Sequence, residues 1–228
     1  GFGEGDFFPN FAHGTAGIAW MFATLYKESK VERYLDLAKR AVVYLQSIAV
    51  GDESGTLIPY LDNPKTGPTW DKYYLSTCHG PVGTTLVFRM LYELTGEQEY
   101  LDWIKRLARG IIRAGAPEKN SWGYWASNCQ CCGAPGVLEH FVSVYELTGE
   151  EEFLEYAKRT ADVLVGDSQL LDGKRRWMSA WNRPTPEVVK SFTGFYVGSA
   201  GGSSSLLKPY SALENKPFTD IFEYIYFD

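Results

Sequence analysis

The stretch "CHGPVGTTLVFRMLYELTGEQEYLDWIKRLARGI", residues 78–111, decides the fold, because the chain repeats its plan. Its second half aligns without a gap with residues 25–45 and 144–164. Its G-x-x-G start recurs in "AHGTAG" (12–17), "CCGAPG" (131–136) and "VGSAGG" (197–202). Self-similarity of this kind is typical of repeat architectures. We therefore expect one domain over residues 1–228, with repeats beginning near 11, 76, 129 and 194.

Each repeat reads as a glycine turn, a helix, a short "ELTGE" turn and a second helix. Apolar residues of the second helix (97–113) recur at 3.6-residue spacing and favour an amphipathic helix. The first helix (81–94) is apolar nearly all round, so we expect it to be buried. The pattern predicts an all-α fold, an α/α toroid or part of one, with an inner and an outer ring of helices. Charged residues of the "ELTGEEEF" turns are expected to be solvated.

The glycine turns decide where chemistry is expected. Glycine permits close backbone approach and positive φ, and each inner helix would begin with its turn at the same end of the ring. The residues just before each first glycine would then meet on one rim. These residues are Ala12–His13, Cys78–His79, Cys131–Cys132 and Tyr196–Val197.

Three cysteines of this rim favour a zinc site. Thiolates bind zinc well, and three protein ligands leave one of four positions open, as in catalytic sites. Cys78, Cys131 and Cys132 are therefore the expected ligands, although His79 could replace one of them. The alternative is three buried thiols that pack at the turns. A disulfide is disfavoured because a reducing compartment is the default, and a bridge between adjacent Cys131 and Cys132 would be strained.

The remaining candidates are weaker. His13 stands before its glycine and suits a general acid or base, since histidine exchanges protons near neutral pH. It could instead be a ligand or a helix cap. Cys129 is a spare thiol or lines the site, and His140 favours a satisfied core position. Aromatic residues of the loops near the rim could hold a peptide or simply pack; they are Trp70, Trp122, Tyr124 and Trp125.

The bulk composition excludes some functions. A net charge of −6 disfavours a general nucleic-acid surface. The chain has no run of about 18 apolar residues, so no membrane span is expected. Its first residues lack the basic start and apolar block of a signal peptide, which favours a cytoplasmic protein.

The ordered turns "AHGTAG", "TCHGPVG" and "CQCCGAPG" resemble those of the lanthionine synthetase C-like (LanC-like) family. The final "GSAGGSSSLLKPYSALENKPFTDIFE" is similar to the family's last repeat. The resemblance covers essentially the whole chain and implies an α/α toroid in which four of seven repeats are present. It also implies zinc on Cys78, Cys131 and Cys132, His13 as a proton carrier, and no ligand role for His79. Thr77 stands where the family has tryptophan.

The resemblance implies an enzyme that forms carbon–sulfur bonds. Such a cyclase adds a cysteine thiol of a dehydrated precursor peptide to dehydroalanine or dehydrobutyrine, giving (methyl)lanthionine thioether rings in lanthipeptide biosynthesis. Two alternatives stay within the family: glutathione addition to dehydroamino acids in proteins, and a non-catalytic binding or scaffold module. A carbohydrate-active toroid needs paired carboxylates on the rim, and the glycine turns carry none.

The resemblance also bears on partners. An open arc of four repeats would expose apolar flanks, so the missing half of the toroid is an expected partner. A dehydratase that prepares the peptide is another.

Overall fold

The computed structural model describes residues 3–69, 73–119, 127–179 and 187–214. Seven helices dominate these residues, as the all-α prediction requires, and two short antiparallel hairpins that were not predicted accompany them. The elements are α1 (Thr15–Ser29), α2 (Glu32–Ser47), β1 (Val50–Asp52), β2 (Gly55–Leu57), α3 (Pro81–Thr95), α4 (Gln98–Arg113), α5 (Ala134–Thr148), α6 (Glu151–Gly166), β3 (Ser168–Leu171), β4 (Lys174–Trp177) and α7 (Ser199–Leu213).

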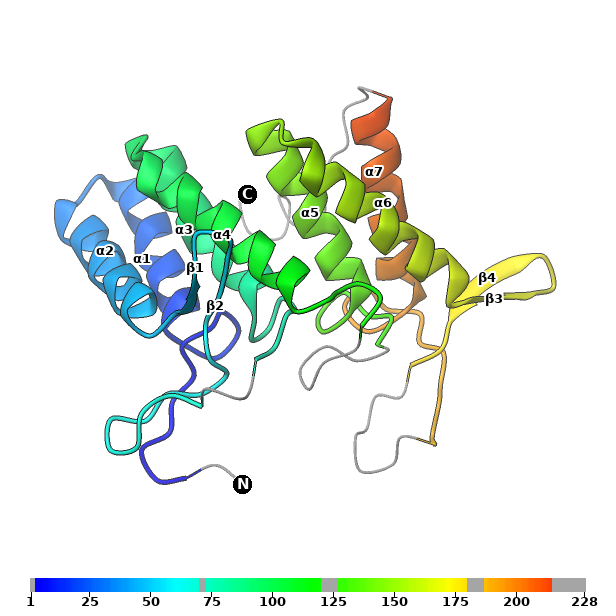
Figure 1. Ribbon diagram of the computed structural model, residues 1–228, viewed down its shortest axis with the longest axis horizontal. Helices are drawn as coiled ribbons and strands as arrows, with labels where there is room; N and C mark the ends of the chain where they lie inside the picture. Colours follow the sequence, from blue (N-terminus) through cyan, green and yellow to red (C-terminus); the bar gives the residue numbers. More distant parts are fainter. Residues whose placement is uncertain (1–2, 70–72, 120–126, 180–186, 215–228) are drawn as a thin grey trace.

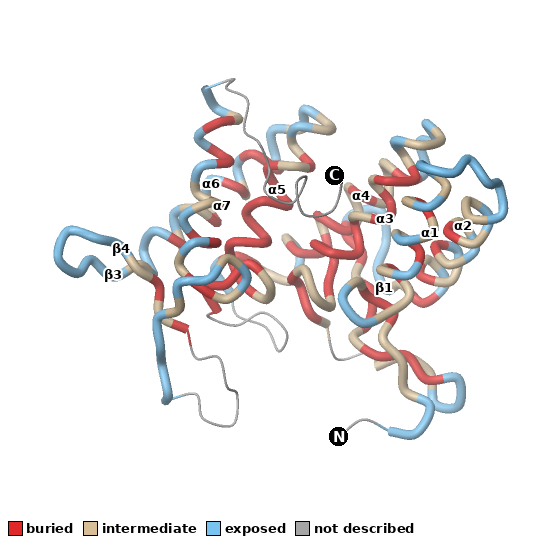
Figure 2. Tube along the Cα trace, turned by 180° about the vertical axis from the view of Figure 1, so that it is seen from behind, coloured by how far each residue is buried: buried red, intermediate tan, exposed pale blue. Residues whose placement is uncertain are grey.

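The helices pair in chain order, α1 with α2, α3 with α4 and α5 with α6 (Figure 1). The first helix of each pair, together with α7, begins at the same edge, which is the lower edge of Figure 1. Figure 2 shows that α5 is buried along most of its length. Helix α4 buries one face only, with Ile104, Leu107 and Ile111 almost inaccessible to solvent. This two-layer arrangement of inner and outer helices is that of an α/α toroid. No described helix has the length and apolarity needed to cross a membrane.

The "ELTGE" turn ends the inner helices α3 and α5. Gly96 and Gly149 take left-handed φ values of 70° and 69°, and their N–H groups donate to the carbonyls of Tyr92 and Tyr145. These are helix C-caps of the kind for which glycine is preferred. Lys30 fills the same position after α1 with φ 58°.

The glycine turns differ from expectation in one respect. The first glycine of each turn has an extended φ, between −133° and −147°, so the expected positive φ is wrong. Close approach is the real requirement. A Cβ on Gly14, Gly80 or Gly133 would run into the carbonyl oxygen six residues earlier, and the second glycine of each turn has the same relation to its own upstream carbonyl. Each inner helix therefore starts against the loop that leads into it.

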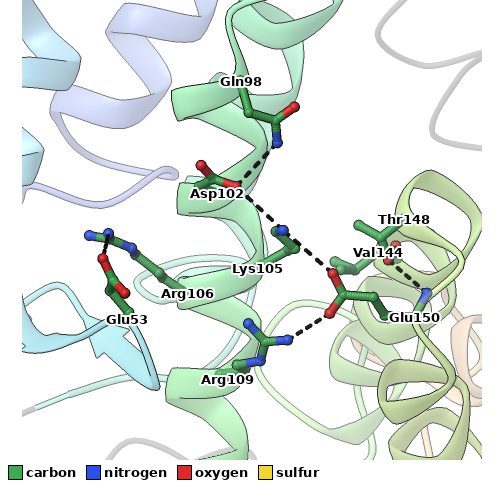
Figure 3. A network of polar contacts seen from close by, with 9 residues as sticks. All are labelled: Glu53, Gln98, Asp102, Lys105, Arg106, Arg109, Val144, Thr148 and Glu150. Atoms are coloured by element: carbon green, nitrogen blue, oxygen red, sulfur yellow. Dashed lines mark hydrogen bonds and ion pairs between the residues drawn. The ribbon is translucent and has the colours of Figure 1, made fainter.

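The charged turns are also more than solvated surface. Arg109 of α4 donates to Glu150 at 2.6 Å, across the boundary between two repeats (Figure 3). It also donates to Glu152 at 3.0 Å. Lys105 reaches Glu150 at 3.5 Å. About a third of each of the Arg109 and Glu150 side chains is exposed. Glu151 and Glu152 are exposed, as expected, whereas Glu150 is partly buried because the repeat places the acidic turn beside the basic face of α4.

Candidate metal centre

Backbone hydrogen bonds link the glycine turns along the rim. The N–H of Ala12 donates to the carbonyl of Cys78 at 2.8 Å, that of Cys78 to Cys131 at 3.4 Å, and that of Cys131 to Tyr196 at 3.0 Å. Each donor and acceptor lies two residues before the first glycine of its turn. The four turns therefore form one ladder with a single direction, and equivalent side chains are brought side by side.

The ladder gathers three sulfurs. The Sγ atoms of Cys78, Cys131 and Cys132 all lie within 4.8 Å of one another, and all three residues are partly buried. Among the described residues this is the one group of three or more metal-type side chains within that reach. The Sγ atoms of Cys131 and Cys132 are 3.3 Å apart. The three predicted ligands are thus together, and His79 is not among them.

Two of the sulfurs are bonded to each other. Cys78 and Cys131 form a disulfide, with Cα atoms 6.0 Å apart. The sequence disfavoured a disulfide on grounds of compartment, whereas the ladder places these two backbones at a separation that suits one. A disulfide sulfur is not a thiolate ligand, so the disulfide and a three-thiolate metal site exclude each other. Reduction of this pair yields the ligand set.

The reduced cluster fits zinc. Zinc–thiolate bonds are about 2.3 Å long, and tetrahedral geometry then separates the sulfurs by about 3.8 Å. That separation is compatible with three sulfurs within 4.8 Å of one another. Cys78 and Cys132 also lie three and two residues before the first residues of α3 and α5, at the end of each helix where the dipole favours negative charge. The donor set and its surroundings suit a soft divalent ion.

Cys129 is separate from this group. It is fully buried, and its Sγ lies 3.0 Å from the Ser127 hydroxyl. A hydrogen bond with the Cys132 thiol, aided by Ser127, lowers the pKa of the Cys129 thiol. Cys129 is therefore a neighbour of the candidate ligands rather than a fourth member of the cluster.

His13 lies beside the cysteine turn and is exposed. It follows Ala12, which bonds to Cys78, and its ring centroid is 5.0 Å from that of His79. The helix-cap alternative is wrong, because the start of α1 has no side-chain cap. The structure thus leaves the His13 side chain at the rim, close to the turn that carries Cys78.

His79 is surrounded by aromatic rings. Its centroid lies 4.9 Å from that of Phe8, 5.1 Å from Tyr60 and 5.5 Å from Tyr74. Tyr60 lies in the same loop as Trp70, but neither it nor Phe8 was among the aromatic residues that the sequence singled out. The His79 ring therefore packs between His13 and these aromatic side chains.

His140 is a core residue, as predicted, but it is not fully satisfied. Its Nε2 has no hydrogen-bond partner among the described residues, and complete burial lowers the pKa of His140 to about 3. Trp70, Trp122, Tyr124 and Trp125 lie outside the described residues.

Sequence reasoning missed the residues that join the two cysteine turns. The Thr77 hydroxyl donates to the carbonyl of Gln130 at 3.2 Å. The Gln130 side chain in turn accepts from Ser205 at 2.8 Å, and Ser205 also lies 2.7 Å from Glu139. Gln130 is almost fully buried, although it is a polar residue between Cys129 and Cys131. That position between cysteines was the available signal.

Comparison with known proteins agrees with this architecture. The family profile described as "Lanthionine synthetase C-like protein" matches residues 3–223. No curated protein matches the chain. Two similar solved structures are the Lin0763 protein from Listeria innocua (17% identity, TM-score 0.60, 90% of this chain and 57% of that chain) and nisin cyclase (15% identity, TM-score 0.63, 88% and 46%).

The fold also occurs in enzymes of other kinds. Cellobiose 2-epimerase from Bacillus thermoamylovorans is similar at 18% identity and a TM-score of 0.53, over 88% of this chain and 55% of that chain. At such identities the structures show the shared fold alone, and the chain spans about half the length of these proteins. The family profile, by contrast, covers nearly every residue. The chain belongs to the lanthionine synthetase C-like family.

Proposed function

We propose that this chain is the zinc-binding part of a thioether-forming cyclase. The observation that carries the proposal is the meeting of Cys78, Cys131 and Cys132 within 4.8 Å, on the rim that also holds His13. The proposed substrate is a dehydrated precursor peptide with a free cysteine. A reducing compartment, for which we propose the cytoplasm, would keep all three protein cysteines as free thiols, which lose their protons when they bind zinc.

The three cysteines have one task, to hold the ion. Zinc, when bound, lowers the pKa of a thiol in its open position and so supplies a thiolate at neutral pH. Three thiolates also donate more charge than two thiolates and an imidazole, which favours a weakly held and nucleophilic substrate sulfur. The helix starts behind Cys78 and Cys132 stabilise the negative charge that such a donor set concentrates.

His13 has the second task, to move a proton. Attack of the substrate sulfur on the β-carbon of a dehydro residue forms the C–S bond and leaves negative charge that extends to the α-carbon. One proton on that carbon completes the product. We assign this proton to His13 in its protonated form, because its side chain is exposed beside the Cys78 turn. The His79 ring is its neighbour, with the two ring centroids 5.0 Å apart.

The first test is zinc content under reducing conditions. We expect about one zinc per chain, lost in Cys131→Ala and in Cys132→Ala and kept in Cys129→Ala, which is the matched control. A ligand set that includes Cys129 would show as zinc lost in all three variants. Folded, reduced protein without zinc would refute the proposal.

The second test separates the reaction from the metal. His13→Asn should keep its zinc and lose about 10²–10⁴-fold in the rate of thioether formation, the usual contribution of a general acid. A peptide carrying cysteine and dehydroalanine is compared with glutathione plus a dehydroalanine peptide. Turnover of glutathione alone would favour the glutathione-adding alternative. Zinc binding without either reaction would favour a binding module.

A further inference from the structure

Gln130 is a buried polar residue that is bonded in two directions. It stands directly before Cys131, and only 1% of it is exposed. Its backbone carbonyl accepts from the Thr77 hydroxyl at 3.2 Å, and its side-chain Oε1 accepts from the Ser205 hydroxyl at 2.8 Å. The first bond ties it to the residue before Cys78, and the second ties it to helix α7.

A glutamine in this place is costly unless it is held by partners. A long side chain loses rotamer entropy on burial, and a buried amide without a hydrogen bond is unfavourable. An apolar residue of similar length would fill the same space without the second cost. The packing is close as well, since a Cβ on Gly201 would lie 3.2 Å from the Cβ of Gln130. We therefore look for the role of the amide in what it connects.

The Ser205 hydroxyl is the centre of a buried polar cluster between α5 and α7, two helices that pack on each other (Figure 1). Ser205 is fully buried. Besides Gln130, its oxygen has two neighbours, Oε1 of Glu139 at 2.7 Å and the carbonyl oxygen of Gly201 at 3.0 Å. Hydrogen bonds are stronger in such low-dielectric surroundings, and a missing one costs more, so the cluster favours a single arrangement.

A buried ion pair anchors the far side of this cluster. Oε2 of Glu139, in α5, lies 3.9 Å from Nζ of Lys208, in α7, and the two side chains are only 9% and 10% exposed. Opposite charges attract more strongly inside a protein than in water. The pair therefore fixes the carboxylate whose other oxygen contacts Ser205.

We propose that Gln130 is a positioning residue for the zinc ligands and that Ser205, Glu139 and Lys208 hold it in place. The proposal rests on the zinc site proposed above. Residues that do not touch a metal can orient those that do and so tune metal affinity. Here the connection runs from the ion pair through the serine hydroxyl and the glutamine amide to the peptide bond before Cys131. A helix of the next repeat thus keeps the two cysteine turns at one separation.

The test is the zinc affinity of the reduced chain, measured by competition with a chromophoric chelator. Ser205→Ala and Gln130→Met each remove one polar partner and should weaken zinc binding about 10–100-fold, the usual effect of losing a residue that orients a ligand. Thr160→Val is the matched control, because Thr160 is fully buried but its hydroxyl bonds within α6, to the carbonyl of Tyr156 at 2.7 Å. The control should keep its zinc affinity.

Two combined variants separate positioning from stability. Gln130→Met with Ser205→Ala should bind zinc no more weakly than Gln130→Met alone, because both changes break the same connection. Glu139→Leu with Lys208→Met replaces both charges of the buried pair by apolar side chains, which is often neutral for stability. This variant should unfold at the same urea concentration as the wild type and still bind zinc more weakly. Cobalt(II) bound in place of zinc should show shifted visible absorption bands, since these bands report ligand geometry.

The outcomes distinguish this proposal from the proposed function. A wild-type chain without zinc would overturn both. Zinc binding by the wild type, with equal affinities in Ser205→Ala and Thr160→Val, would overturn the positioning role alone and leave the cluster as a packing contact. Additive effects of Gln130→Met and Ser205→Ala would overturn it too. Circular dichroism checks the fold, and Ser205→Ala, the mildest change, tests the proposal by itself where Gln130→Met does not fold.

Discussion

A single methyl group at Gly136 should weaken the proposed zinc site. Gly136 is the second glycine of the turn that carries Cys131 and Cys132. A Cβ there would lie 2.6 Å from the carbonyl oxygen of Gln130 and 2.8 Å from the Thr77 hydroxyl. Real Cβ contacts shorter than 3.0 Å are essentially never seen, so α5 and the Gln130–Cys131 segment must separate by at least about 0.4 Å.

The expected size follows from that shift. Overpacking of this kind costs about 1–3 kcal/mol of stability. Functional sites require placement within about 0.5 Å, so a displacement of ~0.4 Å or more is large enough to disturb the sulfurs. Structural zinc is held by about 12 kcal/mol through four ligands, or about 3 kcal/mol each. Loss of about half of one ligand's contribution would weaken zinc binding roughly tenfold.

Gly149→Ala is the matched control at the other end of α5. Gly149 has φ +69°, and a Cβ there would meet nothing within 4 Å. The variant should lose about 1–2 kcal/mol because alanine is strained in the left-handed region. Both variants are measured by urea unfolding and by zinc titration against a chromophoric chelator. Equal zinc affinities in Gly136→Ala and Gly149→Ala would refute the reasoning. They would show that a similar loss of stability at either end of α5 has the same effect on zinc binding.

Three further predictions concern stability. The pKa of His140 falls from an ordinary value of 6.5 to about 3. The unfolded chain then binds the proton more readily between these values, so stability should decrease as pH falls below 6.5, by about 2 kcal/mol between pH 6.5 and 5. His140→Gln should remove that part of the pH dependence in urea titrations, and an unchanged slope would contradict the assignment. Arg109→Met breaks a partly exposed ion pair with Glu150 and should cost about 1 kcal/mol in low salt and less in high salt, measured by the urea midpoint; a loss that salt does not alter would point to packing instead. Phe141→Ala, at a fully buried position, should cost about 3–5 kcal/mol, and a loss below 1 kcal/mol would show that α5 is not packed as described.

Local patterns in the sequence predicted the helices well. The apolar spacing of residues 97–113 gave the buried face of α4, where Ile104, Leu107 and Ile111 are almost inaccessible. The glycines of the "ELTGE" turns marked the helix ends. These features are local, because helix periodicity and the left-handed freedom of glycine act within a few residues. The two hairpins escaped prediction, since strands of three or four residues carry little periodicity.

The site required information from distant parts of the chain. The repeat alignment placed Ala12, Cys78 and Cys131 at equivalent positions, but it could not show that backbone hydrogen bonds tie those positions into a ladder. It also misjudged the φ of the turn glycines, which are needed for close approach to a carbonyl six residues upstream. Phe8 and Tyr60 gave no sequence signal, because their role comes only from packing around His79.

By itself the sequence determined the repeat, the order of the helices and the residues that reach the rim, since these depend on patterns that each repeat carries within itself. Only the tertiary structure decided which sulfurs meet, that Glu150 pairs with Arg109 across a repeat boundary, and which faces of α1 and α7 stay exposed. The physical reason is that contacts between repeats depend on how neighbouring helices stack, and the stacking brings together residues more than 40 positions apart.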